Sequence, residues 1–137
     1  MQIKRKIRIL TGKMGLDCHD NGIVAISNLL KEKGYEIIYL GLHNSADKLL
    51  NSAIQEDVDI IGLSFLCGTH MPRIMELIEL MKKKEVHFPI MVGGVIPVGD
   101  AQRLEKLGIK VYPPGTPIHV IESEGIHKLV SSQRGFS

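Results

Sequence analysis

The chain has 137 residues, 44% of them apolar and 23% charged, which is the composition of a globular protein with one core. Its net charge of +2 comes from interspersed residues, and no basic stripe carries aromatic side chains, which argues against a nucleic-acid partner. No apolar run is long enough to cross a membrane, and no signal peptide is visible. Two cysteines, Cys18 and Cys67, make no disulfide framework, so we expect a cytoplasmic protein.

Strand and helix patterns alternate along the chain. Apolar runs of strand length are expected at residues 6–11, 35–40, 58–64, 88–92 and 109–112. Helical segments are expected at residues 22–33, 45–56, 71 onward, 100–107 and 117 onward. Gly34 is expected to end the first helix, Ser45 to cap the second and Pro72 to lie in the first turn of the third.

This alternation predicts an α/β fold. Strands joined by helices of this length form right-handed crossovers and a parallel sheet. Five such units favour a flavodoxin-like sheet in the order 2-1-3-4-5, with helices on both faces. We expect one domain over residues 1–137, with residues 131–137 as a frayed polar tail.

The segment Asp17-Cys18-His19-Asp20-Asn21-Gly22 follows the first expected strand. Open α/β sheets bind ligands at the edge where the strands end. Asp17 can accept a hydrogen bond from one ring nitrogen of His19, which leaves the other nitrogen for a metal. A His–Asp pair that merely caps a loop turn is an equally good interpretation of this segment taken alone.

Further unusual residues follow the later strands, in Ser64-x-Leu66, Gly93-Gly94 and the segment 112–116. Taken in order with Asp17-x-His19-x-x-Gly22, they resemble the signature of the cobalamin-binding domain of coenzyme B12-dependent mutases and methionine synthase. The resemblance covers nearly the whole chain. Residues 13–17 and 55–59 look most like methylmalonyl-CoA mutase and related acyl-CoA mutases, whereas Asp17-Cys18-His19 and residues 111–116 also resemble the small subunit of glutamate mutase.

The resemblance implies that adenosylcobalamin binds with its nucleotide tail in a slot at the sheet edge. His19 would replace the base of that tail as the lower axial ligand of cobalt, Asp17 would orient His19, and Lys13 would keep Asp17 ionised. These three residues are the implied catalytic set. The implied cofactor contacts are Asp17, Cys18, His19, Asp20, Gly22, Ser64, Leu66, Gly93, Gly94, Tyr112, Gly115 and Thr116, with Val95, Ile96 and Pro97 at the rim.

Individual roles follow from the same resemblance. Ser64 would hydrogen-bond the displaced base, and Leu66 would pack against the tail. Gly22, Gly93 and Gly94 would let the backbone approach it closely. Cys18 is interpreted as a small wall of the pocket, since no general base accompanies it.

The implied function is that of the cobalamin-binding subunit of an acyl-CoA mutase, inactive alone. Its partner would be a larger (β/α)₈ barrel subunit that holds the acyl-CoA. The small subunit of glutamate (methylaspartate) mutase is the alternative within the class. A corrinoid carrier for methyl transfer is an alternative outside it, although such carriers usually have a helical domain before the first strand. A receiver-like signalling domain would need an aspartate where the third strand ends in Ser64.

The remaining distinctive residues are interpreted as structural. His43 and His70 are expected to be polar surface residues. Met75, Leu77, Ile78 and Met81 are expected to form a core stripe on the third helix.

Overall fold

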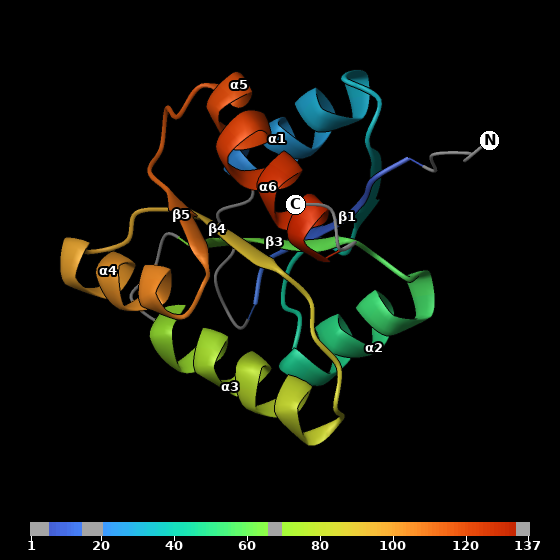
Figure 1. Ribbon diagram of the computed structural model, residues 1–137, viewed down its shortest axis with the longest axis vertical. Coiled ribbons are helices and arrows are strands. Elements are labelled where there is room, and N and C mark those ends of the chain that lie inside the picture. Colours follow the sequence, from blue (N-terminus) through green and yellow to red (C-terminus); the bar gives the residue numbers. More distant parts are fainter. Residues whose placement is uncertain (1–5, 15–20, 66–69, 134–137) are drawn as a thin grey trace.

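The computed structural model describes residues 6–14, 21–65 and 70–133 and shows a five-stranded parallel sheet between two layers of helices (Figure 1). The strand order is β2-β1-β3-β4-β5, which confirms the predicted topology. The elements, in chain order, are β1 (Arg8–Gly12), α1 (Asn21–Glu32), β2 (Glu36–Tyr39), α2 (Ala46–Glu56), β3 (Ile60–Phe65), α3 (His70–Lys83), β4 (Ile90–Gly94), α4 (Val98–Lys106), β5 (Lys110–Tyr112), α5 (Ile118–Val120), the π-helix η1 (Ile121–Ile126) and α6 (His127–Gln133).

Local signals in the sequence set several helix boundaries. The Ser45 side chain accepts a hydrogen bond from the backbone nitrogen of Lys48 at 3.1 Å, as predicted for the cap of α2. Pro72 is the third residue of α3, where its missing N–H is tolerated. Helix α4 begins at Val98, two residues before the predicted start, because Pro97 takes the cap position.

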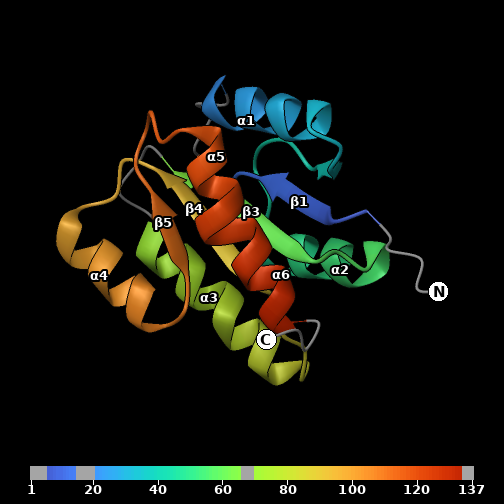
Figure 2. The same cartoon turned by 45° about the horizontal axis from the view of Figure 1, so that its top comes forward.

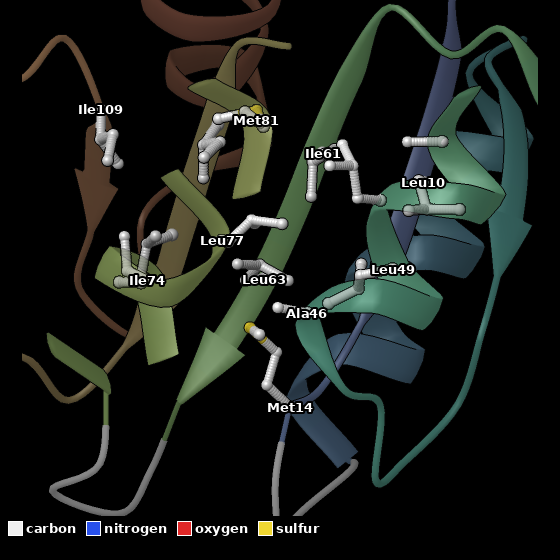
Figure 3. Packing of buried hydrophobic residues seen from close by; sticks show 14 of the residues in the cluster. Leu10, Met14, Ala46, Leu49, Ile61, Leu63, Ile74, Leu77, Met81 and Ile109 are labelled. Atoms are coloured by element: carbon white, nitrogen blue, oxygen red, sulfur yellow. The ribbon is translucent and has the colours of Figure 1, made fainter. Parts of the chain in front are cut away.

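Each strand sends alternate residues to opposite faces, so two separate apolar clusters form. Helices α2, α3 and α4 cover one face, and α1 with the C-terminal helices covers the other (Figures 1 and 2). The first cluster contains Leu10, Ile61, Leu63 and Val92 together with Leu49, Ile74 and Leu77 of the helices (Figure 3). The second, smaller cluster contains Ile9, Ile60 and Met91 together with Leu30, Ile121, Ile126 and Val130.

Two details of the helices differ from the sequence-based expectation. The core stripe of α3 contains Ile74, Leu77 and Met81, whereas Met75 is 37% exposed. Met75 lies one position from Ile74, about 100° around the helix, and therefore leaves the buried face. The last helix contains a π segment and continues through Gln133, so residues 131–133 are helical. None of the helices in the described ranges is long and apolar enough to span a bilayer.

Candidate functional site

A cavity of about 350 Å³ opens between α1 and the carboxyl half of the sheet. This volume lies within the range of small-molecule sites, about 300–1,000 Å³. Gly22, Ala25, Ile26 and Leu29 of α1 form one wall. The other walls come from the strand residues Ile9, Thr11, Gly62, Ser64, Met91 and Gly93, from the segment 112–116 and from Ile121.

The strand register explains why the cavity lies at this edge. Ile9 pairs with Ile60 near the amino end of the sheet, on the face that α1 covers. Two residues further along, Thr11 pairs with Gly62, and beyond them Ser64 pairs with Gly93. Bulky side chains thus fill the amino half of this face, and small ones leave the carboxyl half hollow.

Most of the hydroxyl groups on the cavity wall are engaged within the protein. The Thr11 and Ser27 oxygens lie 2.8 Å apart, and the Ser27 hydroxyl donates to the carbonyl oxygen of Ile23 at 2.6 Å. The Thr116 hydroxyl donates to the carbonyl oxygen of Pro113 at 2.6 Å. Of the cavity-lining hydroxyls, those of Ser64 and Tyr112 therefore remain able to donate a hydrogen bond to a ligand.

Tyr112 of β5 lines the cavity. Its hydroxyl is buried and has no hydrogen-bond partner within the described ranges. Burial, followed by the negative charges of Glu124 and Glu105, raises the pKa of Tyr112. Gly125 of the π-helix makes room for the phenol, since a Cβ there would overlap the Tyr112 hydroxyl.

Lys13 directly follows β1 and is fully buried. Its Nζ donates to the carbonyl oxygen of Ser64 at 2.9 Å and lies 3.4 Å from the Ser64 hydroxyl oxygen. Lys13 thereby links the ends of β1 and β3. Its predicted pairing with Asp17 lies outside the described residues, so it stays a prediction.

Asn44 holds the backbone of Lys13 in place. It is 1% exposed, and its side-chain amide donates to the carbonyl oxygens of Lys13 and Gly41, both at 2.9 Å. The backbone nitrogen of Asn44 also donates to the carbonyl oxygen of Lys13 at 3.0 Å. The chain therefore leaves β1 in a defined direction toward residues 15–20.

The two glycines of the Gly93-Gly94 pair serve different purposes. Gly94 has a φ of +116°, and a Cβ there would overlap the Phe65 carbonyl, so the fold itself requires glycine. At Gly93 the nearest atom to a Cβ would be the Tyr112 carbonyl oxygen at 3.8 Å, an ordinary contact. At Gly22 no atom of the described residues would lie within 4 Å of a Cβ. The fold does not require Gly93 or Gly22, and both line the open cavity.

The structure brings many of the predicted cofactor contacts together around this cavity, namely Gly22, Ser64, Gly93, Gly94, Tyr112, Gly115 and Thr116. Val95 and Ile96 line an adjoining groove, and Pro97 caps α4. The predicted residues Asp17, Cys18, His19, Asp20 and Leu66 lie outside the described ranges.

The interpretation of His70 as a surface residue is wrong. It is 4% exposed, and its Nε2 lies 2.7 Å from a carboxylate oxygen of Asp100. Its position as the first residue of α3 turns the ring inward, edge-on to Phe65. His43 is exposed, as expected.

Sequence reasoning missed several residues of the cavity wall. Ile26 and Leu29 of α1 line the cavity without having been singled out in the sequence, and Leu29 is 46% exposed. The small residues Thr11 and Gly62 were missed as well. Both residues interrupt otherwise apolar strands in the sequence. Their meaning becomes clear only from the strand register, which places them side by side.

Comparison with known proteins is consistent with this geometry. The family model described as "B12 binding domain" matches residues 7–118. The small subunit of 2-hydroxyisobutanoyl-CoA mutase from Aquincola tertiaricarbonis is 36% identical over 129 residues, which cover 93% of this chain and 94% of that subunit. Ethylmalonyl-CoA mutase from Cereibacter sphaeroides is 34% identical over 114 residues, which cover 82% of this chain but 18% of that protein.

Among solved structures, a cobalamin-binding protein from Desulfitobacterium hafniense aligns with a TM-score of 0.70 over 97% of this chain and 60% of that one. At 16% identity this likeness concerns the fold. The family model and the small-subunit relative each cover most of the described chain. The protein therefore belongs to the B12-binding domain family.

Proposed function

We propose that this chain is the cobalamin-binding small subunit of an adenosylcobalamin-dependent acyl-CoA mutase. It would act with a separate, larger subunit whose (β/α)₈ barrel holds the acyl-CoA. The observation that carries the proposal is the apolar cavity between α1 and the sheet, in a chain that matches a mutase small subunit over nearly its whole length.

The cavity fits the nucleotide tail of cobalamin. A flat aromatic base needs an apolar slot with few polar partners, and the walls supply Ile9, Ile26, Met91 and Ile121. The open space beside Gly22 and Gly93 allows the tail to approach the backbone. The Ser64 hydroxyl then provides a polar contact for the base.

The residues after β1 would hold the cobalt. His19 would be the axial ligand, and Asp17 would accept a hydrogen bond from its second ring nitrogen, which fixes the ring and raises its basicity. Lys13 and Asn44 anchor the chain just before these residues. When bound, adenosylcobalamin supplies the radical chemistry through cleavage of its cobalt–carbon bond.

The division of labour follows from what this chain contains. Its residues bind and orient the cofactor, while acyl-CoA binding and substrate choice belong to the larger subunit. This chain matches only 18% of ethylmalonyl-CoA mutase. That small share supports the proposal that acyl-CoA binding requires a further, larger polypeptide. The choice of acyl group is therefore not encoded in the cavity.

Two experiments test the proposal. First, the purified chain is titrated with adenosylcobalamin and its absorption spectrum is recorded. Release of the benzimidazole from cobalt is expected, and His19→Ala should abolish or greatly weaken this binding. An unchanged spectrum with tight binding would count against histidine ligation.

Second, the chain is mixed with the larger subunit that the proposal requires, adenosylcobalamin and candidate substrates. Turnover of 2-hydroxyisobutyryl-CoA, isobutyryl-CoA or methylmalonyl-CoA is expected only when both subunits are present. Turnover of glutamate instead would identify the alternative mutase. Methyl transfer from a bound methylcobalamin, without isomerisation, would identify a corrinoid carrier.

A further inference from the structure

We infer that His70 and Asp100 form a positioning pair that fixes the Gly93-Gly94 wall of the cofactor cavity. The inference rests on the proposed function, because it assigns these residues to the binding of the nucleotide tail. Neither residue lines the cavity itself, so the effect must be transmitted through the backbone between β4 and α4.

The pair joins two segments that follow neighbouring strands. His70 is the first residue of α3, which follows β3, and Asp100 lies in the first turn of α4, which follows β4. The Nε2–Oδ2 distance is 2.7 Å, and the two side chains are 5% and 27% exposed. Because a carboxylate only accepts hydrogen bonds, Nε2 of His70 carries the proton and donates.

Only residues 95–97 separate the end of β4 from the start of α4. The near end of this short connection is held to β3, since the backbone nitrogen of Val95 donates to the carbonyl oxygen of Phe65 at 3.1 Å. The far end is held by Asp100 to His70. A connection fixed at both ends leaves little freedom for Gly94, which directly precedes it and lines the cavity.

Stability alone does not account for such a pair. Apolar residues of similar volume often replace a buried polar pair without loss of stability, whereas a hydrogen-bonded pair favours one arrangement of its neighbours. His70 also leaves its Nδ1 buried, with no hydrogen-bond partner in the described part of the chain. This arrangement costs free energy and is consistent with a geometric role.

The test compares His70→Met, which keeps the volume but removes the donor, with His70→Gln, whose amide nitrogen can still donate to Asp100. Glu76→Gln is the matched control, because it disturbs the exposed Arg73–Glu76 pair on the same helix. Each variant is titrated with adenosylcobalamin and with cobinamide, a corrinoid that lacks the nucleotide tail. Thermal unfolding is recorded for each variant in parallel.

We expect His70→Met to weaken adenosylcobalamin binding about tenfold, by analogy with the loss of residues that orient metal ligands. His70→Gln should restore most of this affinity, and cobinamide binding should change little in either variant. A purely structural role would instead lower the unfolding temperature and weaken both corrinoids together. That result, or unchanged binding in His70→Met, would overturn the inference while leaving the proposed function intact.

Should His70→Met fail to fold, Asp100→Ala removes the acceptor from the more exposed side of the pair and carries the same expectations. Failure of the wild-type chain to bind adenosylcobalamin, alone or with the larger subunit, would overturn the proposed function and this inference with it.

Discussion

The Nζ of Lys13 donates a hydrogen bond to the carbonyl oxygen of Ser64 at 2.9 Å and lies 3.4 Å from its hydroxyl oxygen. An ammonium group cannot accept a hydrogen bond, so the contact of Lys13 with that hydroxyl uses a lone pair of the Ser64 oxygen. The Ser64 proton is then available to a hydrogen-bond acceptor. In the proposed site that acceptor would be the free nitrogen of the displaced benzimidazole.

The first prediction tests this hydroxyl. Ser64→Ala should weaken adenosylcobalamin binding by about five- to tenfold, the value of one ordinary hydrogen bond of ~1 kcal/mol. Binding of cobinamide, which has no benzimidazole, should not change. Isothermal titration of both corrinoids measures the difference. Ser123→Ala is the control, because its hydroxyl donates to the carbonyl oxygen of His119 away from the cavity.

The second prediction separates the two neighbouring glycines. Gly94→Ala should destabilise the fold by about 2–3 kcal/mol, because alanine is strained at a φ of +116° and its Cβ would overlap the Phe65 carbonyl. Gly93→Ala should leave stability nearly unchanged, yet weaken cofactor binding, since its methyl group would occupy the cavity. Denaturant unfolding and corrinoid titration measure the two effects. Equal losses of stability in both variants would contradict this assignment.

The third prediction concerns stability in acid. A hydrogen bond from Tyr35 at 2.7 Å, together with the ion pair to Lys33, lowers the pKa of Glu122 below its ordinary value of 4.5. A lowered folded-state pKa stabilises the protein above the unfolded-state pKa, and this contribution is lost as the pH falls from about 4.5 through the folded value. Glu122→Gln should therefore lower the melting temperature at pH 7 and flatten the decline below pH 4.5. Parallel slopes in the two proteins would refute the link to Glu122.

The fourth prediction addresses the expected axial ligand. Asp17→Asn should preserve the fold but weaken cofactor binding by about 10–100-fold, the usual cost of losing the carboxylate that orients a ligating histidine. Circular dichroism checks the fold, and a spectrophotometric titration measures the affinity. Undiminished affinity would show that Asp17 does not orient His19.

The spacing of apolar residues, together with the residues that start and end helices, was sufficient to predict the architecture. Strand-length apolar runs alternated with helical ones, and five such units favoured the sheet order that the structure shows. Ser45 and Pro72 marked helix starts because capping and the missing proline N–H act within one turn. Such local effects need no knowledge of distant residues.

The burial of His70 could not be predicted from such local patterns. A histidine beside a glycine and a threonine gives no sign of burial, and its partner Asp100 lies 30 residues away. Met75 was misplaced for a related reason. An apolar residue on a helix can face the core, solvent or a cavity, and the choice depends on what the sheet presents opposite it.

The sequence by itself determined the parallel α/β sheet and the edge at which Gly22, Ser64 and Gly93 gather, because these depend on local spacing and on the handedness of crossovers. Only the tertiary structure decided that Thr11 and Gly62 meet, and that Ser64 and Gly93 meet, to leave a hollow beneath α1. It also decided that Lys13 reaches Ser64 and His70 reaches Asp100. The Lys13–Ser64 and His70–Asp100 contacts join residues that are 51 and 30 positions apart. They arise from strand register and helix packing, which no local pattern specifies.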